Sequence, residues 1–236
     1  MTLGTVRSSV EHRPQADKCV VRPAGGYEQS GKATFAHDLP QRPLQLRGSR
    51  LARWGLQRLG WTVIFDGLPA RQGVVVVYPH TSNWDFPLAV LTKWAVGIDL
   101  SFWGKDSLFR IPLFGRWLRW LGGIPVLRHT RQGVVGQMCE RMQLAKSRDE
   151  YFWLGLSPEG TRALTEGWRS GFYQVALQAD VPLGLVFFDY AARQVGVRHF
   201  VRLSGEREAD MALIAARLQS HQGKYPERAA PIRLRA

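Results

Sequence analysis

The sequence has little cysteine and no long apolar run, and each shortage excludes a class of protein. Only two cysteines, Cys19 and Cys139, occur in 236 residues, which excludes a disulfide framework and favours a reducing compartment. The absence of a Cys-x-x-Cys pair excludes zinc ribbons and zinc fingers. No apolar run approaches the roughly 18 residues of a membrane-spanning helix, and the N-terminus lacks the apolar core of a secretory signal.

Positive charge, in contrast, is in excess. Lysine and arginine number 32 against 19 acidic residues, so the net charge is +13, and all but six of the bases are arginine. Such a chain should seek anions, whether nucleic acid, an anionic membrane surface or phosphorylated substrates. Nine tryptophans add to this, because tryptophan and arginine together suit a lipid–water boundary.

The chain divides into a tail and one domain of ordinary size. Residues 1–43 are rich in Gly, Pro, Ser, Gln and charge without a sustained period, so we predict a flexible, disordered tail. Residues 44–236 are long enough to bury a core without disulfides or a structural metal.

From Leu44 onward, strand-like and helix-like segments alternate. The β-branched or aromatic runs that predict strands are Trp61–Asp66, Val74–Tyr78, Leu100–Gly104, Ile124–Leu127, Tyr151–Leu156, Leu183–Asp189 and Val195–Leu203. Helix-length stretches lie at about 83–96, 107–121, 133–147, 170–180 and 206–220. This alternation predicts an α/β fold with a mostly parallel central sheet flanked by helices. The run from Val74 to Val77 has no polar alternation and should be buried on both faces. Met211, Ile214 and Leu218 should share one helix face.

Seven of the nine tryptophans and +8 of the net charge fall within residues 47–131. Four arginines between residues 47 and 58 are interleaved with Leu51, Trp54 and Leu59. A second segment, 113–121, has an apolar face of Leu113, Phe114, Trp117, Leu118 and Leu121 beside Arg116 and Arg119. Such segments can lie in a membrane interface. The alternative is that they face the protein core while the arginines are solvated.

The first group of residues that could carry chemistry is Pro79-His80-Thr81-Ser82-Asn83-Trp84-Asp85, which follows a buried strand and opens a helix. Ligands of open parallel sheets bind beyond the carboxyl ends of strands. With Ser82 as the helix cap, Asp85 would occupy the third helical position. Its carboxylate could then hold the His80 imidazole as a base. The alternative is structural, since Ser-x-x-Asp is near a capping-box spacing.

A second group, Ser157-Pro158-Glu159-Gly160-Thr161-Arg162, follows the strand that ends at Leu156. Glycine permits close backbone approach to a ligand, and arginine can grip a phosphate with two hydrogen bonds. The alternative is a tight turn with a surface arginine.

Together these groups resemble the motifs of the glycerol-phosphate and lysophospholipid acyltransferase family. His80 to Asp85 is similar to its H-x-x-x-x-D motif, and Glu159 to Arg162 is similar to its E-G-T-R motif. Gly122 to Arg128 resembles the family's G-x-I-P-V-D-R block, although Leu127 replaces the acidic residue. Two weaker likenesses are Gly104-Lys105-x-x-Leu108-Phe109 and Val181-Pro182-Leu183.

The resemblance implies transfer of a fatty acyl group from acyl-CoA or acyl carrier protein to the hydroxyl of a (lyso)glycerophospholipid. His80 would be the general base and Asp85 its orienting partner, with no acyl-enzyme. The oxyanion would be held by backbone N–H groups near a helix start. Lys105, Arg128 and Arg162 are candidates for the acceptor phosphate; the alternative for Lys105 and Arg128 is a solvated surface charge. By resemblance Glu159, with Gly160 and Thr161, belongs to the acceptor pocket. We predict no cofactor and no metal, because the six histidines are dispersed.

These features predict peripheral attachment to the cytoplasmic face of the cell membrane through anionic lipids. Three alternatives remain. A nucleic-acid-binding protein would share the charge, but no helix-turn-helix, RRM or KH signature is present, so we do not expect nucleic acid as a partner. A non-catalytic lipid-binding protein would not need the intact motifs. Within the family, the acceptor could be a different lyso-lipid such as an aminolipid.

Overall fold

The computed structural model describes residue 44, residues 46–126 and residues 133–235. The segment predicted to be a disordered tail, 1–43, lies outside these residues, as does Cys19. The strands are β1 (Thr62–Ile64), β2 (Gln72–Tyr78), β3 (Leu100–Lys105), β4 (Gly123–Val126), β5 (Phe152–Leu156), β6 (Leu183–Asp189) and β7 (Gln194–Val201). The helices are α1 (Arg50–Arg58), α2 (Asp85–Val96), α3 (Asp106–Phe109), α4 (Phe114–Trp120), α5 (Gly133–Ser147), α6 (Gly171–Gln178) and α7 (Arg207–Leu218), followed by the short 3-10 helix η1 (Pro226–Arg228).

The seven strands form one sheet in the order β1-β7-β6-β2-β5-β3-β4. Strand β2 is central and pairs in parallel with both β5 and β6, and β3 continues the parallel pairing from β5 to β4. Strand β7 pairs antiparallel with β6. Strand β1 pairs in parallel with β7 and forms the edge of the sheet. The prediction of a mostly parallel α/β sheet flanked by helices is therefore confirmed.

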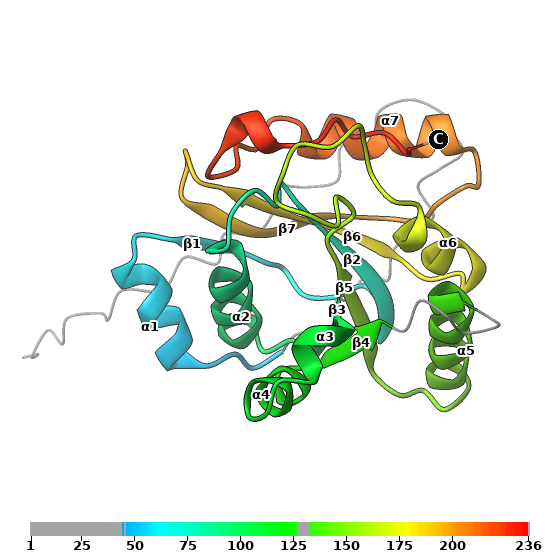
Figure 1. Ribbon diagram of the computed structural model, residues 1–236, viewed down its shortest axis with the longest axis horizontal. Coiled ribbons are helices and arrows are strands. Elements are labelled where there is room, and N and C mark those ends of the chain that lie inside the picture. The colour runs from blue at the N-terminus through cyan, green and yellow to red at the C-terminus, as the bar shows by residue number, and fades with distance from the viewer. Residues whose placement is uncertain (1–43, 45, 127–132, 236) are drawn as a thin grey trace, which may run out of the picture.

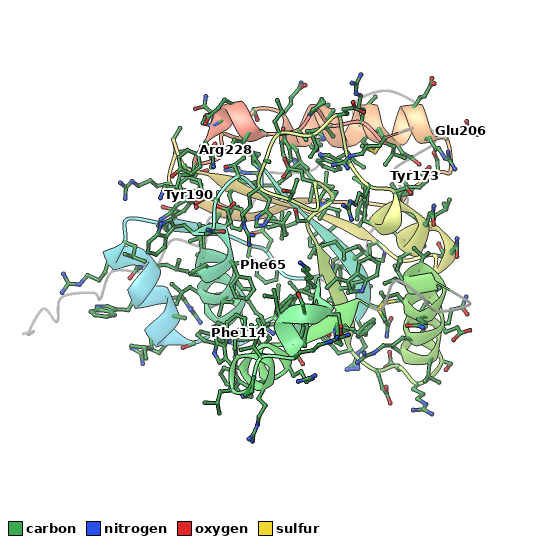
Figure 2. All side chains as sticks on the ribbon, viewed as in Figure 1. Phe65, Phe114, Tyr173, Tyr190, Glu206 and Arg228 are labelled. Atoms are coloured by element: carbon green, nitrogen blue, oxygen red, sulfur yellow. The ribbon has the colours of Figure 1, made fainter. Side chains whose placement is uncertain are left out.

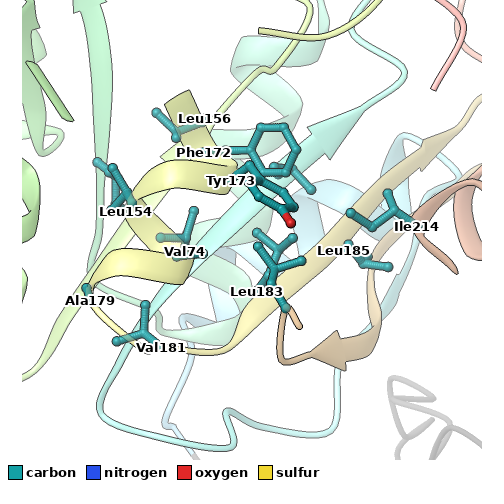
Figure 3. Packing of buried hydrophobic residues seen from close by; sticks show 14 of the residues in the cluster. Val74, Leu154, Leu156, Phe172, Tyr173, Ala179, Val181, Leu183, Leu185 and Ile214 are labelled. Atoms are coloured by element: carbon teal, nitrogen blue, oxygen red, sulfur yellow. The ribbon is translucent and has the colours of Figure 1, made fainter. Parts of the chain in front are cut away.

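Helices lie on both sides of the sheet (Figure 1), and each face of the sheet has its own apolar layer. On one face, α5, α6 and α7 bury residues such as Met142, Phe172 and Ile214 against β2, β5 and β6. Figure 3 shows Phe172 and Ile214 in this layer. On the other face, α1 and α2 bury Leu56 and Leu88. Helix α2 lies on the face opposite to α5 and α6 because the chain moves outward from β2 to β4 and then back to β6, and right-handed crossovers in opposite directions place their helices on opposite faces.

The hydrophobic pattern of the sequence translates directly into these layers. Val74, Val75 and Val76 of β2 are buried, as a central strand covered by helices on both faces requires. The predicted stripe of Met211, Ile214 and Leu218 is the buried face of α7. The prediction for α7 is confirmed. That for β2 is confirmed for Val74, Val75 and Val76, whereas Val77 is only half-buried.

Three local predictions were wrong or incomplete. The sequence pattern favoured one helix over 107–121, but the structure has α3 and α4 separated at Pro112, because proline disfavours helical conformation in the residue before it and removes a hydrogen-bond donor. Helix α1 was not predicted, and α2 begins at Asp85, with Trp84 rather than Ser82 at the N-cap position.

The two Trp- and Arg-bearing segments bury only part of their apolar surface. In α4, Leu118 is buried, as is Leu121 just after it, whereas Leu113, Phe114 and Trp117 remain exposed. In α1, Ala52 and Leu56 face the core. Each helix therefore packs through one side and leaves a second apolar side in solvent.

Candidate active site

Three neighbouring strands deliver their following loops to one edge of the sheet. Strand β2 leads into the loop with His80, β5 into the turn with Glu159, and β6 into Tyr190. Because β5 and β6 both pair with β2 in parallel, these three carboxyl ends lie side by side. This is where open α/β sheets bind ligands.

His80 and Asp85 face each other across the start of α2. The two side chains approach to 3.2 Å between His80 Nδ1 and Asp85 Oδ2. The separation suits an ion pair, but the alignment falls short of a hydrogen bond. Catalytic contacts of this kind commonly tighten when substrate binds. The His80 side chain keeps 17% of its surface exposed, whereas that of Asp85 keeps 1%, so the imidazole is the member of the pair that a substrate could reach.

Both oxygens of the Asp85 carboxylate have partners. Ser82 donates its backbone N–H to Oδ2 at 2.9 Å, and the Tyr190 hydroxyl donates to Oδ1 at 2.6 Å. A buried carboxylate needs such donors because it has lost its hydration. The Ser82 hydroxyl in turn accepts the Trp84 N–H at 3.2 Å. The backbone N–H groups of Ser82, Trp84 and Asp85 are thus engaged within this loop, which leaves those three unavailable as the oxyanion donors predicted near a helix start.

A second buried carboxylate, Glu159, anchors the backbone of His80. Its Oε2 accepts the His80 N–H at 2.6 Å, and its Oε1 accepts the Ala230 N–H at 2.9 Å. Glu159 is 1% exposed. The structure therefore occupies both oxygens with backbone donors, and the acceptor contact that the motif implies for Glu159 stays a prediction.

The surroundings of Glu159 have opposing effects on its ionisation. Burial raises the pKa of Glu159, while the N–H groups of Ala230 and His80 act to lower that pKa. Burial, assisted by the nearby Glu159 charge, raises the pKa of Tyr78 to about 12. Tyr78 consequently remains a neutral donor, and its hydroxyl bonds to the Ala230 carbonyl at 3.1 Å. Ala230 is thus held through both its N–H and its C=O.

The turn after Glu159 presents its remaining motif residues to solvent. Gly160 has φ +68, a conformation that favours glycine, and a Cβ there would lie 2.9 Å from Arg169 Nε. Thr161 and Arg162 are exposed. Among the described residues, the Arg162 guanidinium has no ion-pair partner, so its charge is open to a ligand.

The other two predicted phosphate-binding residues are less well placed by the structure. Lys105 ends β3, the strand beyond β5, and is exposed at the same edge of the sheet. Arg128 and Leu127 lie outside the described residues. The phosphate roles of Lys105, Arg128 and Arg162 stay predictions.

The C-terminal segment 222–235, which no motif predicted, crosses the same edge. Tyr225 donates its N–H to the Thr81 hydroxyl at 3.2 Å, and Gly223 lies so close that a Cβ there would be 2.6 Å from the same oxygen. Arg235 donates to the Glu159 carbonyl at 3.1 Å. The segment thus contacts both motif loops, and contacts between parts of the chain so far apart leave no local sequence signal.

Tyr190 was also missed, although a signal existed. It directly follows β6, so the strand-end rule that singled out His80 and Glu159 applies equally to it.

No group of three or more His, Cys, Asp and Glu side chains that could hold a metal ion occurs among the described residues. In the part of the chain that the structure describes, no helix is both long and apolar enough to span a bilayer.

Chemically, the arrangement can perform base catalysis. Asp85 lies against Nδ1, so Nε2 of His80 is the nitrogen available to take a proton from a hydroxyl. A base of this kind is what a weak alcohol nucleophile requires.

One family model matches more than half of this chain. The family model described as Acyltransferase matches residues 62–188, which span β1 to β6 and include both motifs. The structure of the 1-acyl-sn-glycerophosphate (LPA) acyltransferase PlsC from Thermotoga maritima is similar, with a TM-score of 0.49 and 19% sequence identity over 72% of this chain and 74% of that chain. No curated protein matches this sequence.

Proposed function

This chain belongs to the acyltransferase family, and from that premise we propose that it transfers a fatty acyl group from a thioester donor to the hydroxyl of a lysoglycerophospholipid. The observation that carries the proposal is the His80–Asp85 pair at the carboxyl end of the central strand β2. The donor would be acyl-CoA or acyl carrier protein.

In this mechanism Nε2 of His80 removes the proton of the acceptor hydroxyl as its oxygen attacks the thioester carbonyl. The tetrahedral intermediate then breaks its C–S bond, and the imidazolium returns the proton to the leaving thiolate. The products are an ester and a free thiol. Asp85 stabilises the imidazolium between the two steps. The neighbouring Ser82 is buried and its hydroxyl is engaged with Trp84 N–H, which supports direct transfer without an acyl-enzyme.

A panel of acceptors tests the proposal. Purified protein is incubated with labelled acyl-CoA or acyl carrier protein and with lysophosphatidate, a neutral monoacylglycerol or a lyso-aminolipid, and the lipid products are identified. We expect acylated lysophosphatidate as the main product. Acylation of the aminolipid alone would replace the proposed acceptor, and transfer to none of them would contradict the function.

Arg162 provides a specific prediction within this assay. Because its exposed guanidinium is suited to a phosphate, Arg162→Ala should raise the KM for lysophosphatidate by about 10-fold to 100-fold, the value of a lost charged hydrogen bond. The KM for monoacylglycerol should change little. Arg148→Ala, an exposed arginine just before β5 and hence at the opposite edge of the sheet, is the matched control. An equal effect on the neutral acceptor would refute the phosphate role.

We also propose that the enzyme works at the surface of an anionic membrane. The surface concerned, here called the Trp–Arg face, comprises the exposed apolar residues of α1 and of the α3–α4 region with the neighbouring exposed arginines: Leu51, Trp54, Leu59, Leu113, Phe114, Trp117, Trp120, Arg47, Arg50, Arg58, Arg116 and Arg119. Figure 2 marks Phe114 on this surface. The two parts meet at a hollow lined by Arg47, Trp94 and Trp120.

Its composition supports a lipid partner. Leu113 is 77% exposed and Trp120 71%, and Leu113 has a positive φ of 62 that side chains rarely adopt. Each nearby arginine adds about 1 kcal/mol of attraction to anionic headgroups. Trp117 also packs on Phe86, with ring centroids 6.2 Å apart, and Phe86 follows Asp85 in α2. The Trp–Arg face therefore contacts the first turn of α2, which also carries Asp85.

Vesicle binding tests the Trp–Arg face. The protein should bind vesicles of phosphatidylglycerol and phosphatidylcholine more tightly than phosphatidylcholine alone. Leu113→Glu and Trp120→Glu should each weaken this binding at least ~10-fold, because each removes about 1.5–3 kcal/mol of apolar burial. Leu144→Glu, an exposed leucine on α5, is the control. Unchanged binding in both test variants, or tight DNA binding without vesicle binding, would contradict the proposal.

A further inference from the structure

Two side chains of the described residues approach the Asp85 carboxylate with a polar group. One is the imidazole of His80, and the other is the hydroxyl of Tyr190, which donates a hydrogen bond. We propose that Tyr190 is a positioning residue: it fixes the Asp85 carboxylate so that this carboxylate orients His80. The inference rests on the proposed function, since it assumes that His80 and Asp85 act as the base and its partner. Tyr190 belongs to neither motif and lies beyond residues 62–188, which the family model matches.

Because of the hydrogen bond from Tyr190, the two oxygens of the Asp85 carboxylate have different partners. Tyr190 bonds to Oδ1 at 2.6 Å, which leaves Oδ2 directed at Ser82 N–H and at His80 Nδ1. A carboxylate held at one oxygen cannot rotate the other away without breaking that bond. Because Asp85 is 1% exposed, no bulk water would replace the phenol.

Tyr190 is itself held firmly. It follows directly after β6, the strand next to β2, so the sheet fixes its distance from the His80 loop. Its backbone N–H donates to the Gln222 carbonyl at 2.8 Å. Its ring meets Trp61 edge-to-face, with centroids 4.9 Å apart. The phenol therefore has little freedom to follow a moving carboxylate.

The phenol also remains a donor at any working pH. Burial, together with the hydrogen bond and the charge of Asp85, raises the pKa of Tyr190 well above its ordinary value. Among the described residues, the titratable groups that interact with this pair include His80, Glu159 and Tyr225. None of them replaces the contact to Oδ1, because His80 faces Oδ2 and Glu159 bonds to backbone N–H groups.

Tyr190→Phe tests the proposal, since it removes the hydroxyl and keeps the ring that packs on Trp61. We expect kcat for acyl transfer to fall about 10-fold to 100-fold, with the KM of donor and acceptor within about twofold of the parent values. In an Asp85→Ala background the same substitution should change kcat less than about twofold, because no carboxylate remains to be held.

The matched control is Tyr173→Phe. Tyr173 also donates to a buried carboxylate, Asp210, at 2.8 Å, but it lies in α6, away from Tyr190 (Figure 2). The Tyr173→Phe variant should lose about as much stability as Tyr190→Phe and should retain the parent kcat. Trp61→Leu, which loosens the phenol ring without deleting its hydroxyl, should lower kcat in the same direction and carries the test if Tyr190→Phe does not fold.

The results for these variants distinguish the role of Tyr190 from the proposed acyl transfer by His80 and Asp85. Parent-like kcat in Tyr190→Phe and Trp61→Leu, with large losses in His80→Ala and Asp85→Ala, would overturn the role of Tyr190 alone. An equal loss from Tyr190→Phe with and without Asp85 would also overturn it. Parent-like kcat in both His80→Ala and Asp85→Ala would instead refute the proposed base.

Discussion

Replacing His80 with alanine should lower kcat for acyl transfer about 10²-fold to 10⁴-fold, the usual contribution of a general base. The loss should be clean, because Glu159 holds this loop through the backbone N–H of residue 80, which alanine retains. The fold should therefore survive, and thermal unfolding compared with the parent protein checks this. Steady-state kinetics with saturating donor and acceptor provide the rate.

Asp85→Asn is the companion variant. Its amide has one oxygen, so it could accept from Ser82 or from Tyr190 but not from both. The group that faces His80 Nδ1 would then be an N–H or a neutral oxygen, which carries no charge to stabilise the imidazolium. We expect a loss of kcat approaching that of His80→Ala. Near-parental turnover in His80→Ala would show that another group takes the proton.

Much of the fold was readable because its signals are local. The buried valine run predicted the central strand, and the spacing of Met211, Ile214 and Leu218 predicted the covered face of α7. Where local signals compete, prediction was less accurate: the Phe, Trp and Leu pattern after residue 107 favoured one helix, and Pro112 divides it in two.

The candidate active site could be predicted only in part from the sequence, because some of its contacts are not local. His80 and Glu159 stand just beyond strands, Asp85 opens the next helix, and all three lie within motifs, so they could be singled out in the sequence. Their supporting contacts come from Tyr190 and Ala230, 105 and 71 residues away from their partners, and depend on the strand order. No pattern within a short window encodes a backbone N–H such as that of Ala230 as a ligand of a carboxylate.

Glu159→Ala should have the second large effect, on both stability and rate. It removes the acceptor of two backbone N–H groups, those of His80 and Ala230, in a site that is 1% exposed. Each buried donor left without a partner costs about 1–3 kcal/mol, so the free energy of unfolding should fall by about 2–6 kcal/mol. Urea unfolding measures this, and Glu150→Ala, which removes an exposed carboxylate, should stay within about 0.5 kcal/mol of the parent.

The kinetic consequence distinguishes this anchoring role from the acceptor contact implied by the E-G-T-R resemblance. If Glu159 positions His80, its loss should lower kcat even under conditions where the variant is fully folded, because the imidazole is then free to leave Asp85. Glu159→Gln should be milder, since the amide oxygen still accepts one of the two N–H groups while its NH₂ faces the other. A variant with parental stability, parental kcat and a raised KM for the acceptor alone would instead place Glu159 in the acceptor pocket, and the two buried N–H groups would then have to find other acceptors.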